Sequence, residues 1–79
     1  MFYVYILQSR KDQKYYIGQT NNLAKRLTYY NCGKVSATKN IRPFQVVYSE
    51  RYNTRSEAMC REKKIKLMKG GNNFKKLTQ

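Results

Sequence analysis

Few residues in this sequence can do chemistry, and their types exclude several familiar mechanisms. The chain has no histidine, so it has no histidine-based triad and no histidine general base. With only four acidic residues it has no convincing cluster for two metal ions, and no glycine-rich phosphate loop is present. What remains is a glutamate on a core-facing helical line, an arginine beside an apolar stripe and several tyrosines, namely Glu62, Arg26, Tyr3, Tyr5, Tyr15 and Tyr16.

Glu62 is the most informative of these residues. It follows Ala58 by four positions and precedes Ile65 by three, so it lies on the apolar line of an expected helix. Burial of an unpaired carboxylate is costly, so this glutamate needs a partner, a bound cation or a partly exposed edge. One interpretation is structural, with Glu62 paired to Lys66 one turn later or extended to the surface. Helical geometry alone leaves this interpretation and a cation site both open.

Arg26 presents a similar choice. Leu23, Leu27 and Tyr30 recur at i, i+4 and i+7, which places them on one face of a helix. Arg26 lies three residues after Leu23 and four before Tyr30, beside that face. Its stem can cover apolar surface, or its guanidinium can hold a phosphate through two parallel hydrogen bonds. The tyrosines have a simpler interpretation, because strand aromatics commonly pack on a sheet with their hydroxyls in water.

Three strands are expected to position these residues. The first alternates apolar residues on both faces, which indicates that both of its sides are at least partly covered. A polar loop at 9–13 joins it to the second strand as a hairpin. Gly18 and the asparagine pair 21–22 mark the bend that follows the second strand. The strands are expected at 2–7, 14–19 and 44–50.

Capping residues and glycines delimit three helices. The caps are expected at Asn21 or Asn22, at Thr54 or Ser56, and at Asn72 or Asn73. The first helix ends at about Tyr30, the second at Met68 or Lys69, and an exposed loop at 34–43 precedes the third strand. The chain is therefore expected to form a single domain, 1–79, of the α+β class, with a small three-stranded antiparallel sheet flanked by helices in the order β-β-α-β-α-α.

The charge of the chain is strongly one-sided. It carries 17 lysine and arginine residues against four acidic ones, a formal charge of +13 on 79 residues, which favours a polyanionic partner. No stretch approaches about 18 apolar residues, so no membrane segment is expected, and no secretory signal is expected at the N-terminus. Cys32 and Cys60 are far apart, without a histidine to complete a zinc site, which indicates free thiols. The expected partner is a nucleic acid and the expected location is the cytoplasm.

Two tripeptides carry a family resemblance. Tyr3-Val4-Tyr5 is followed, after ten residues, by Tyr16-Ile17-Gly18, and the two resemble the paired tripeptides of the GIY-YIG nuclease domain. Tyr3 stands where the family often has glycine, as in small standalone members. The resemblance covers essentially the whole chain in order, through Thr20-x-x-Leu23-x-x-Arg26-Leu27, Asn31-x-Gly33-Lys34, Arg42-Pro43, Val47-Tyr48-Ser49-Glu50 and Glu57-Ala58-x-x-x-Glu62-x-x-Ile65-Lys66.

The resemblance implies roles for particular residues. Tyr5 and Tyr16 correspond to the active-site tyrosines, and Arg26 corresponds to the phosphate-binding arginine. Tyr30 stands four residues after Arg26, where the family has histidine or tyrosine. Glu62 corresponds to the ligand of a single divalent cation, Mg²⁺ or Mn²⁺.

Some details of the implied site stay open. Gln19 follows the second tripeptide, where some members carry lysine, and a family asparagine beyond the glutamate has only loose candidates in Asn72 and Asn73. Tyrosine is a poor base at its usual pKa of about 10. Either neighbouring cations perturb Tyr5 or Tyr16, or these hydroxyls only orient water.

The activity implied is that of a metal-dependent DNA endonuclease, directed by the structure or damage of the DNA with little sequence preference. Its phosphate contacts are expected from basic residues of the first helix and the loop after it, namely Lys25, Lys34, Lys39 and Arg42. Substrate choice is expected to depend on DNA shape, on a homodimer or on a targeting partner protein. Two alternative functions would also explain the positive charge of the chain. One is a non-catalytic nucleic-acid-binding module with a vestigial nuclease site, and the other is a basic domain whose aromatics stack on RNA bases.

Overall fold

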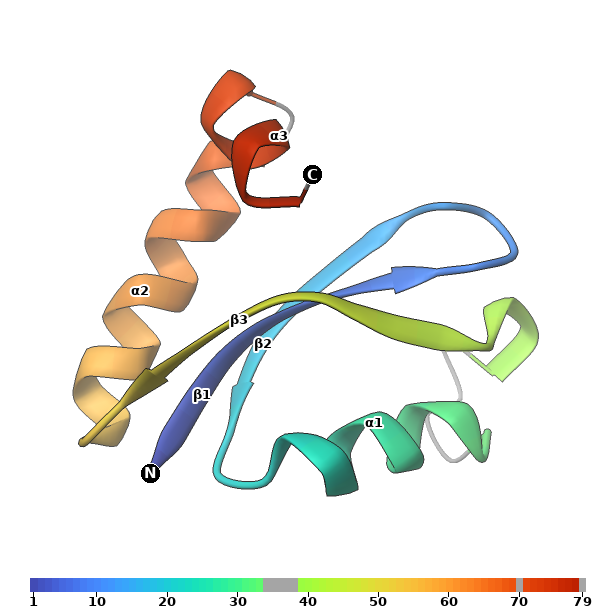
Figure 1. Cartoon of the computed structure of the whole chain (residues 1–79), viewed down its shortest axis with the longest axis horizontal. Helices are drawn as coiled ribbons and strands as arrows, with labels where there is room; N and C mark the ends of the chain where they lie inside the picture. The colour runs from blue at the N-terminus through green and yellow to red at the C-terminus, as the bar shows by residue number, and fades with distance from the viewer. Residues whose placement is uncertain (34–38, 70, 79) are drawn as a thin grey trace.

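The computed structural model describes residues 1–33, 39–69 and 71–78. Within them, strands and α-helices follow one another in the expected order β-β-α-β-α-α, and a short 3-10 helix lies in the region expected to be a loop. The elements are β1 (Phe2–Ser9), β2 (Tyr15–Thr20), α1 (Leu23–Asn31), η1 (Lys39–Ile41), β3 (Phe44–Tyr52), α2 (Arg55–Met68) and α3 (Asn72–Thr78). The α+β class and the antiparallel sheet expected from the sequence are confirmed (Figure 1).

The sheet has β1 at its centre and is antiparallel throughout. Its strand order is β2-β1-β3, so β2 and β3 form the two edges. In the register between β1 and β2, Tyr5 lies opposite Gly18 and Leu7 lies opposite Tyr16. Gly18 therefore sits inside β2, and the bend expected near it begins only after Thr20. The two tripeptides are neighbours across one pair of strands.

The first strand is longer than the sequence indicates and includes Ser9. Ser9 was expected in the polar hairpin loop, but it is fully buried. Its hydroxyl oxygen accepts hydrogen bonds from the backbone N–H groups of Lys11 (3.1 Å) and Asp12 (3.2 Å), and its hydroxyl donates to the carbonyl of Ile41. A serine is tolerated inside this end of the molecule because the hairpin and η1 together satisfy its hydroxyl.

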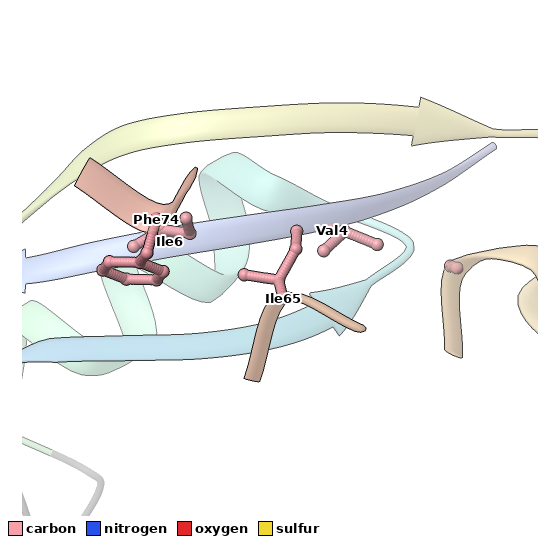
Figure 2. Packing of buried hydrophobic residues seen from close by; sticks show 5 residues of the cluster. Val4, Ile6, Ile65 and Phe74 are labelled. Atoms are coloured by element: carbon pink, nitrogen blue, oxygen red, sulfur yellow. The ribbon is translucent and has the colours of Figure 1, made fainter. Parts of the chain in front are cut away.

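Helices cover both faces of the sheet, as the two apolar faces of β1 predict (Figure 1). On one face, Val4 and Ile6 of β1 pack with Ile65 of α2 and Phe74 of α3 (Figure 2). The opposite face carries a second cluster that packs against α1 and consists of Tyr5, Leu7, Phe44, Leu23, Leu27 and Tyr30. Successive residues of β1 thus point alternately toward α1 and toward the pair α2 and α3.

Asn22 marks the start of α1, and Gly33 follows its end. Asn22 is the cap and not Asn21, because the side-chain oxygen of Asn22 accepts a hydrogen bond from the N–H of Lys25 at 3.0 Å. After the helix, Gly33 has a φ of +81°, a left-handed conformation that favours glycine. The cap at Asn22 makes Leu23 the first residue of α1, so Arg26 lies in the first turn of the helix.

The start of α2 is selected in the same way. Thr54 is the cap and not Ser56: its hydroxyl oxygen accepts from the N–H of Glu57 at 3.3 Å, and its hydroxyl donates to the Glu57 carboxylate at 3.0 Å. At 14 residues α2 is the longest of the described helices. Within the described ranges, no helix combines the length and the apolarity that crossing a membrane would need.

Candidate active site

Tyr5 extends from the central strand over the edge strand. Its side chain is buried on the face that α1 covers, and it lies opposite Gly18 of β2. A Cβ atom placed on Gly18 would lie 2.7 Å from Cζ of Tyr5 and still closer to its hydroxyl. The ring therefore occupies the space that a side chain at position 18 would need, and the hydroxyl of Tyr5 lies at the edge of the sheet.

Three of the other predicted site residues act on the pKa of this hydroxyl. Burial raises the pKa of Tyr5 well above its ordinary value, and Tyr30 acts in the same direction. The guanidinium of Arg26 opposes this shift, and the carboxylate of Glu62 adds to it. Arg26 and Tyr30 belong to α1, and Glu62 belongs to α2. The raised pKa favours the uncharged form of the Tyr5 hydroxyl.

Phe44 connects Tyr16 to the same neighbourhood. The ring of Tyr16 lies edge-on to the buried ring of Phe44, with centroids 5.4 Å apart, and Tyr30 packs against Phe44 at 5.3 Å. Burial raises the pKa of Tyr16, and Asp12 and Tyr30 contribute in the same direction. The sequence predicted both tyrosines as site residues but did not reveal that a phenylalanine from β3 lies between them.

The end of α1 is held to β3 by a paired contact between Asn31 and Phe44. The side-chain oxygen of Asn31 accepts from the N–H of Phe44 at 2.6 Å, and its amide nitrogen donates to the carbonyl of Phe44 at 3.1 Å. The asparagine amide thus imitates a strand-to-strand pair of hydrogen bonds. Because α1 carries Arg26 and Tyr30, this contact fixes the distance of both residues from the sheet.

Arg26 lies beside an open hollow that none of the other predicted catalytic residues lines. It is half-buried on α1, and it has no carboxylate partner among the described residues. The hollow has a volume of about 370 Å³ and is lined by Arg26, Thr20, Asn21, Asn22, Lys25 and Tyr29. A guanidinium with this exposure and without an acidic partner is suited to an anionic group of a ligand.

Glu62 makes the structural contact that its spacing allows. Its Oε2 lies 2.9 Å from Nζ of Lys66, and the two side chains are 19% and 54% exposed. An ion pair open to water is worth about 0–1 kcal/mol, so this pair does not commit Glu62 to a purely structural role. The charge of the carboxylate also contributes to the raised pKa of Tyr5.

The carboxylate of Glu62 fits one particular kind of metal ion. Within the described residues, no group of three or more His, Cys, Asp or Glu side chains could hold a metal. A soft or tightly caged ion is therefore a poor match for the region. Mg²⁺ commonly keeps several of its waters and binds through one or two carboxylates together with substrate phosphates. A single partly exposed glutamate that acts together with a substrate phosphate would match that donor set.

The residues predicted to bind nucleic acid are placed differently from one another. Lys25 is exposed and lines the same hollow as Arg26. Arg42 lies at the other end of α1, where its Nη1 donates to the carbonyl of Asn31 at 3.5 Å and leaves no room for a Cβ atom on Gly33. The backbone of Lys39 begins η1. Lys34 lies outside the described residues.

The three-stranded fold, with the two tripeptides paired across β1 and β2, defines the GIY-YIG class of domain. The family model described as the GIY-YIG catalytic domain matches residues 1–75, and the chain belongs to this family.

Relatives of similar size support the assignment. UPF0213 protein OB0043 of Oceanobacillus iheyensis is 46% identical over 65 residues, which cover 81% of this chain and 74% of that protein. UPF0213 protein NP_0776A of Natronomonas pharaonis is 37% identical over 65 residues, covering 81% and 75% of the two chains. The solution NMR structure of UPF0213 protein BH0048 of Bacillus halodurans matches with a TM-score of 0.54 at 30% identity, covering 89% of this chain and 76% of that one.

Proposed function

We propose that this protein is a divalent-metal-dependent DNA endonuclease that hydrolyses phosphodiester bonds. The observation that carries the proposal is that Tyr5, Tyr16 and Tyr30 lie in one cluster beside α1, and that the charges of Arg26 and Glu62 both act on the pKa of Tyr5. A module that only binds nucleic acid would have no need to bring a cation and a carboxylate into range of one buried hydroxyl.

Each side chain has a defined task in this reaction. Arg26 binds the scissile phosphate and strengthens its hydrogen bonds as negative charge builds on the phosphate oxygens. Tyr5 and Tyr16 are uncharged, since burial raises the pKa of each, so they orient the attacking water and the phosphate through hydrogen bonds. Glu62 holds the divalent cation, which when bound would supply positive charge near the leaving oxygen. Tyr30 orients Tyr5.

The rest of the surface supports binding of the DNA backbone. The formal charge of +13 attracts phosphates whatever the base sequence. Lys25 extends the phosphate site from Arg26 along α1, and Lys34, Lys39 and Arg42 belong to the segment that follows this helix. With little reading of bases, preference among DNA molecules comes from their structure or damage, from a homodimer or from a targeting protein. The proposed location is the cytoplasm.

One observation favours a second candidate, a nucleic-acid-binding module with a vestigial site. Lys66 forms an ion pair with Glu62, and Gln19 stands where some family members carry lysine. In this alternative the lysine permanently neutralises the carboxylate that would otherwise hold the cation. The +13 charge would then serve binding alone. RNA in place of DNA as the ligand belongs to the same alternative.

A cleavage assay with matched variants separates the two candidates. Labelled duplex, flap, fork and four-way-junction DNA, with a single-stranded RNA beside them, are incubated with wild type, Glu62→Gln and Glu57→Gln, with and without Mg²⁺ or Mn²⁺. Glu57 lies on the same helix, is exposed and loses the same charge. Metal-dependent cutting by wild type and Glu57→Gln but not by Glu62→Gln supports the nuclease. Tight binding without cutting under any metal would favour the vestigial site.

A further inference from the structure

Glu50 forms a dense hydrogen-bonded cluster outside the site described above. Arg61 of α2 donates to both of its carboxylate oxygens, from Nε at 2.9 Å and from Nη2 at 3.0 Å. The hydroxyls of Tyr48 and Tyr52 also donate, one to each oxygen. Burial alone would raise the pKa of Glu50, but these hydrogen bonds outweigh it and lower the pKa below its ordinary value. The charged pair thus joins β3 firmly to α2.

Arg61 and Glu62 are adjacent in sequence but leave α2 in different directions. Ala58 and Ile65 are fully buried and define the side of the helix that faces the sheet. At about 100° per residue, Arg61 lies to one side of that buried line and Glu62 to the other. Arg61 reaches the edge strand β3, so Glu62 leaves the helix on the side of the opposite edge strand β2. The helix contacts all three strands.

This geometry couples the two side chains through rotation of the helix. Side-chain ends lie about 5–6 Å from a helix axis, so a rotation of about 10° moves them by about 1 Å. An apolar line such as that of Ala58 and Ile65 restrains rotation weakly, since dispersion contacts have little directionality. A two-pronged guanidinium–carboxylate contact is directional and restrains it strongly. A shift of about 1 Å can lower a catalytic rate by about a hundredfold.

We propose that Glu50 and Arg61 are positioning residues that set the rotation of α2 and thereby set the direction in which Glu62 would be presented to a divalent cation. This inference rests on the proposed function of Glu62 as the cation ligand. Neither residue touches substrate. Tyr48 and Tyr52 hold the Glu50 carboxylate in the orientation that Arg61 needs. A buried ion pair is weak evidence for a role in stability alone, whereas four hydrogen bonds to one carboxylate fix its direction.

The test compares three variants by cleavage, by Mn²⁺ affinity and by NMR. Arg61→Lys keeps the charge but loses the planar fork, and Tyr52→Phe removes one hydroxyl donor with little change in volume. Arg51→Lys, an exposed residue on β3, is the matched control. Mn²⁺ affinity is measured by electron paramagnetic resonance, and the positions of the Tyr5 and Gly18 signals are followed by NMR without metal. Thermal unfolding reports whether each variant is folded.

Arg61→Lys is expected to lower kcat by about tenfold or more with KM nearly unchanged, to weaken Mn²⁺ binding severalfold and to shift the Tyr5 and Gly18 signals, with Tyr52→Phe intermediate. Folded variants with control-like Tyr5 and Gly18 signals would overturn the positioning role, whatever their activity. If wild type neither binds Mn²⁺ nor cuts DNA, the proposed function fails. The NMR comparison still decides whether Arg61 sets the position of α2 relative to Tyr5.

Discussion

The ring of Tyr5 on the central strand lies against the backbone of Gly18 on the edge strand, and no side chain fits between them. A Cβ atom at position 18 would be 2.7 Å from Cζ of Tyr5, a distance that real Cβ atoms do not adopt. Gly18 does not have a positive φ, so its role is close approach and not backbone conformation. The absence of a side chain at Gly18 allows the Tyr5 hydroxyl to reach the edge of the sheet.

Gly18→Ala should therefore destabilise the protein, although replacing glycine by alanine inside a strand ordinarily helps. Overpacking of this kind costs about 1–3 kcal/mol, and the displaced Tyr5 should lower the cleavage rate by more than about tenfold. Chemical denaturation and the cleavage assay measure the two effects. In a Tyr5→Leu background the stability cost should largely vanish, because the shorter side chain ends before the new methyl group. An equal cost in both backgrounds would show that Tyr5 is not the obstacle.

Arg26 should be far more important for the rate than for the fold. Arg26→Ala is expected to lower kcat by about 10²–10³, because it removes the charge that stabilises the developing negative charge on the phosphate. Arg26→Lys should recover only part of the loss, since lysine lacks the two-pronged geometry. Single-turnover cleavage measures both, with Arg51→Ala as an exposed arginine that loses the same charge. A loss for Arg26→Ala no larger than for the control would make it a packing residue.

The ion pair between Lys66 and Glu62 should compete with the divalent cation. The Lys66 side chain is largely open to water, so the pair is worth about 0.2–1 kcal/mol and Lys66→Gln should tighten Mn²⁺ binding by up to about fivefold. Electron paramagnetic resonance of free Mn²⁺ gives the affinity. Lys63→Gln removes the same charge from an exposed position of the same helix and should change the affinity less. If both variants tighten binding equally, the cause is net charge and not the ion pair.

The Glu50 cluster predicts how stability depends on pH. The pKa of Glu50 is lowered below about 4.5, so its stabilising contribution is full above that value and is lost as the pH falls. The hydrogen bond to Glu50, followed by burial, raises the pKa of Tyr52 from 10 to about 12, so its contribution is full below pH 10 and is lost between these values. Chemical denaturation across the pH range should show both losses. Glu50→Gln should reduce the loss of stability at acidic pH, and Tyr52→Phe should reduce the loss at alkaline pH. If neither variant changes the pH dependence, the cluster is not its source.

DNA affinity should depend steeply on salt. If about five phosphates are contacted, the logarithm of the affinity should fall with the logarithm of the salt concentration with a slope of about −4 to −5. Lys25→Ala should make that slope shallower by about one while leaving the rate at saturating DNA close to wild type, because Lys25 lines the hollow beside Arg26. Fluorescence anisotropy at several salt concentrations gives the slopes. A flat response would argue against phosphate binding as the source of affinity.

Much of the fold could be predicted because its determinants are local. Alternation of apolar residues specified β1 and both of its faces, and asparagine and threonine caps marked where α1 and α2 begin. The exceptions depend on partners distant in sequence. Ser9 is buried because Ile41 accepts its hydroxyl, and β3 runs past Glu50 to Tyr52 because Tyr52 pairs with Phe2.

The features of the candidate site also divide into those that the sequence indicates and those that depend on distant partners. The sequence by itself determined which residues are candidates: type and spacing singled out Arg26 and Glu62, and the family resemblance added Tyr5. Only the tertiary structure decided that the Tyr5 ring crosses Gly18, that Phe44 lies between Tyr16 and Tyr30, and that Arg61 binds Glu50. The physical reason is the placement of β1 between β2 and β3. Strand order and register bring these residues together, and no local pattern specifies either.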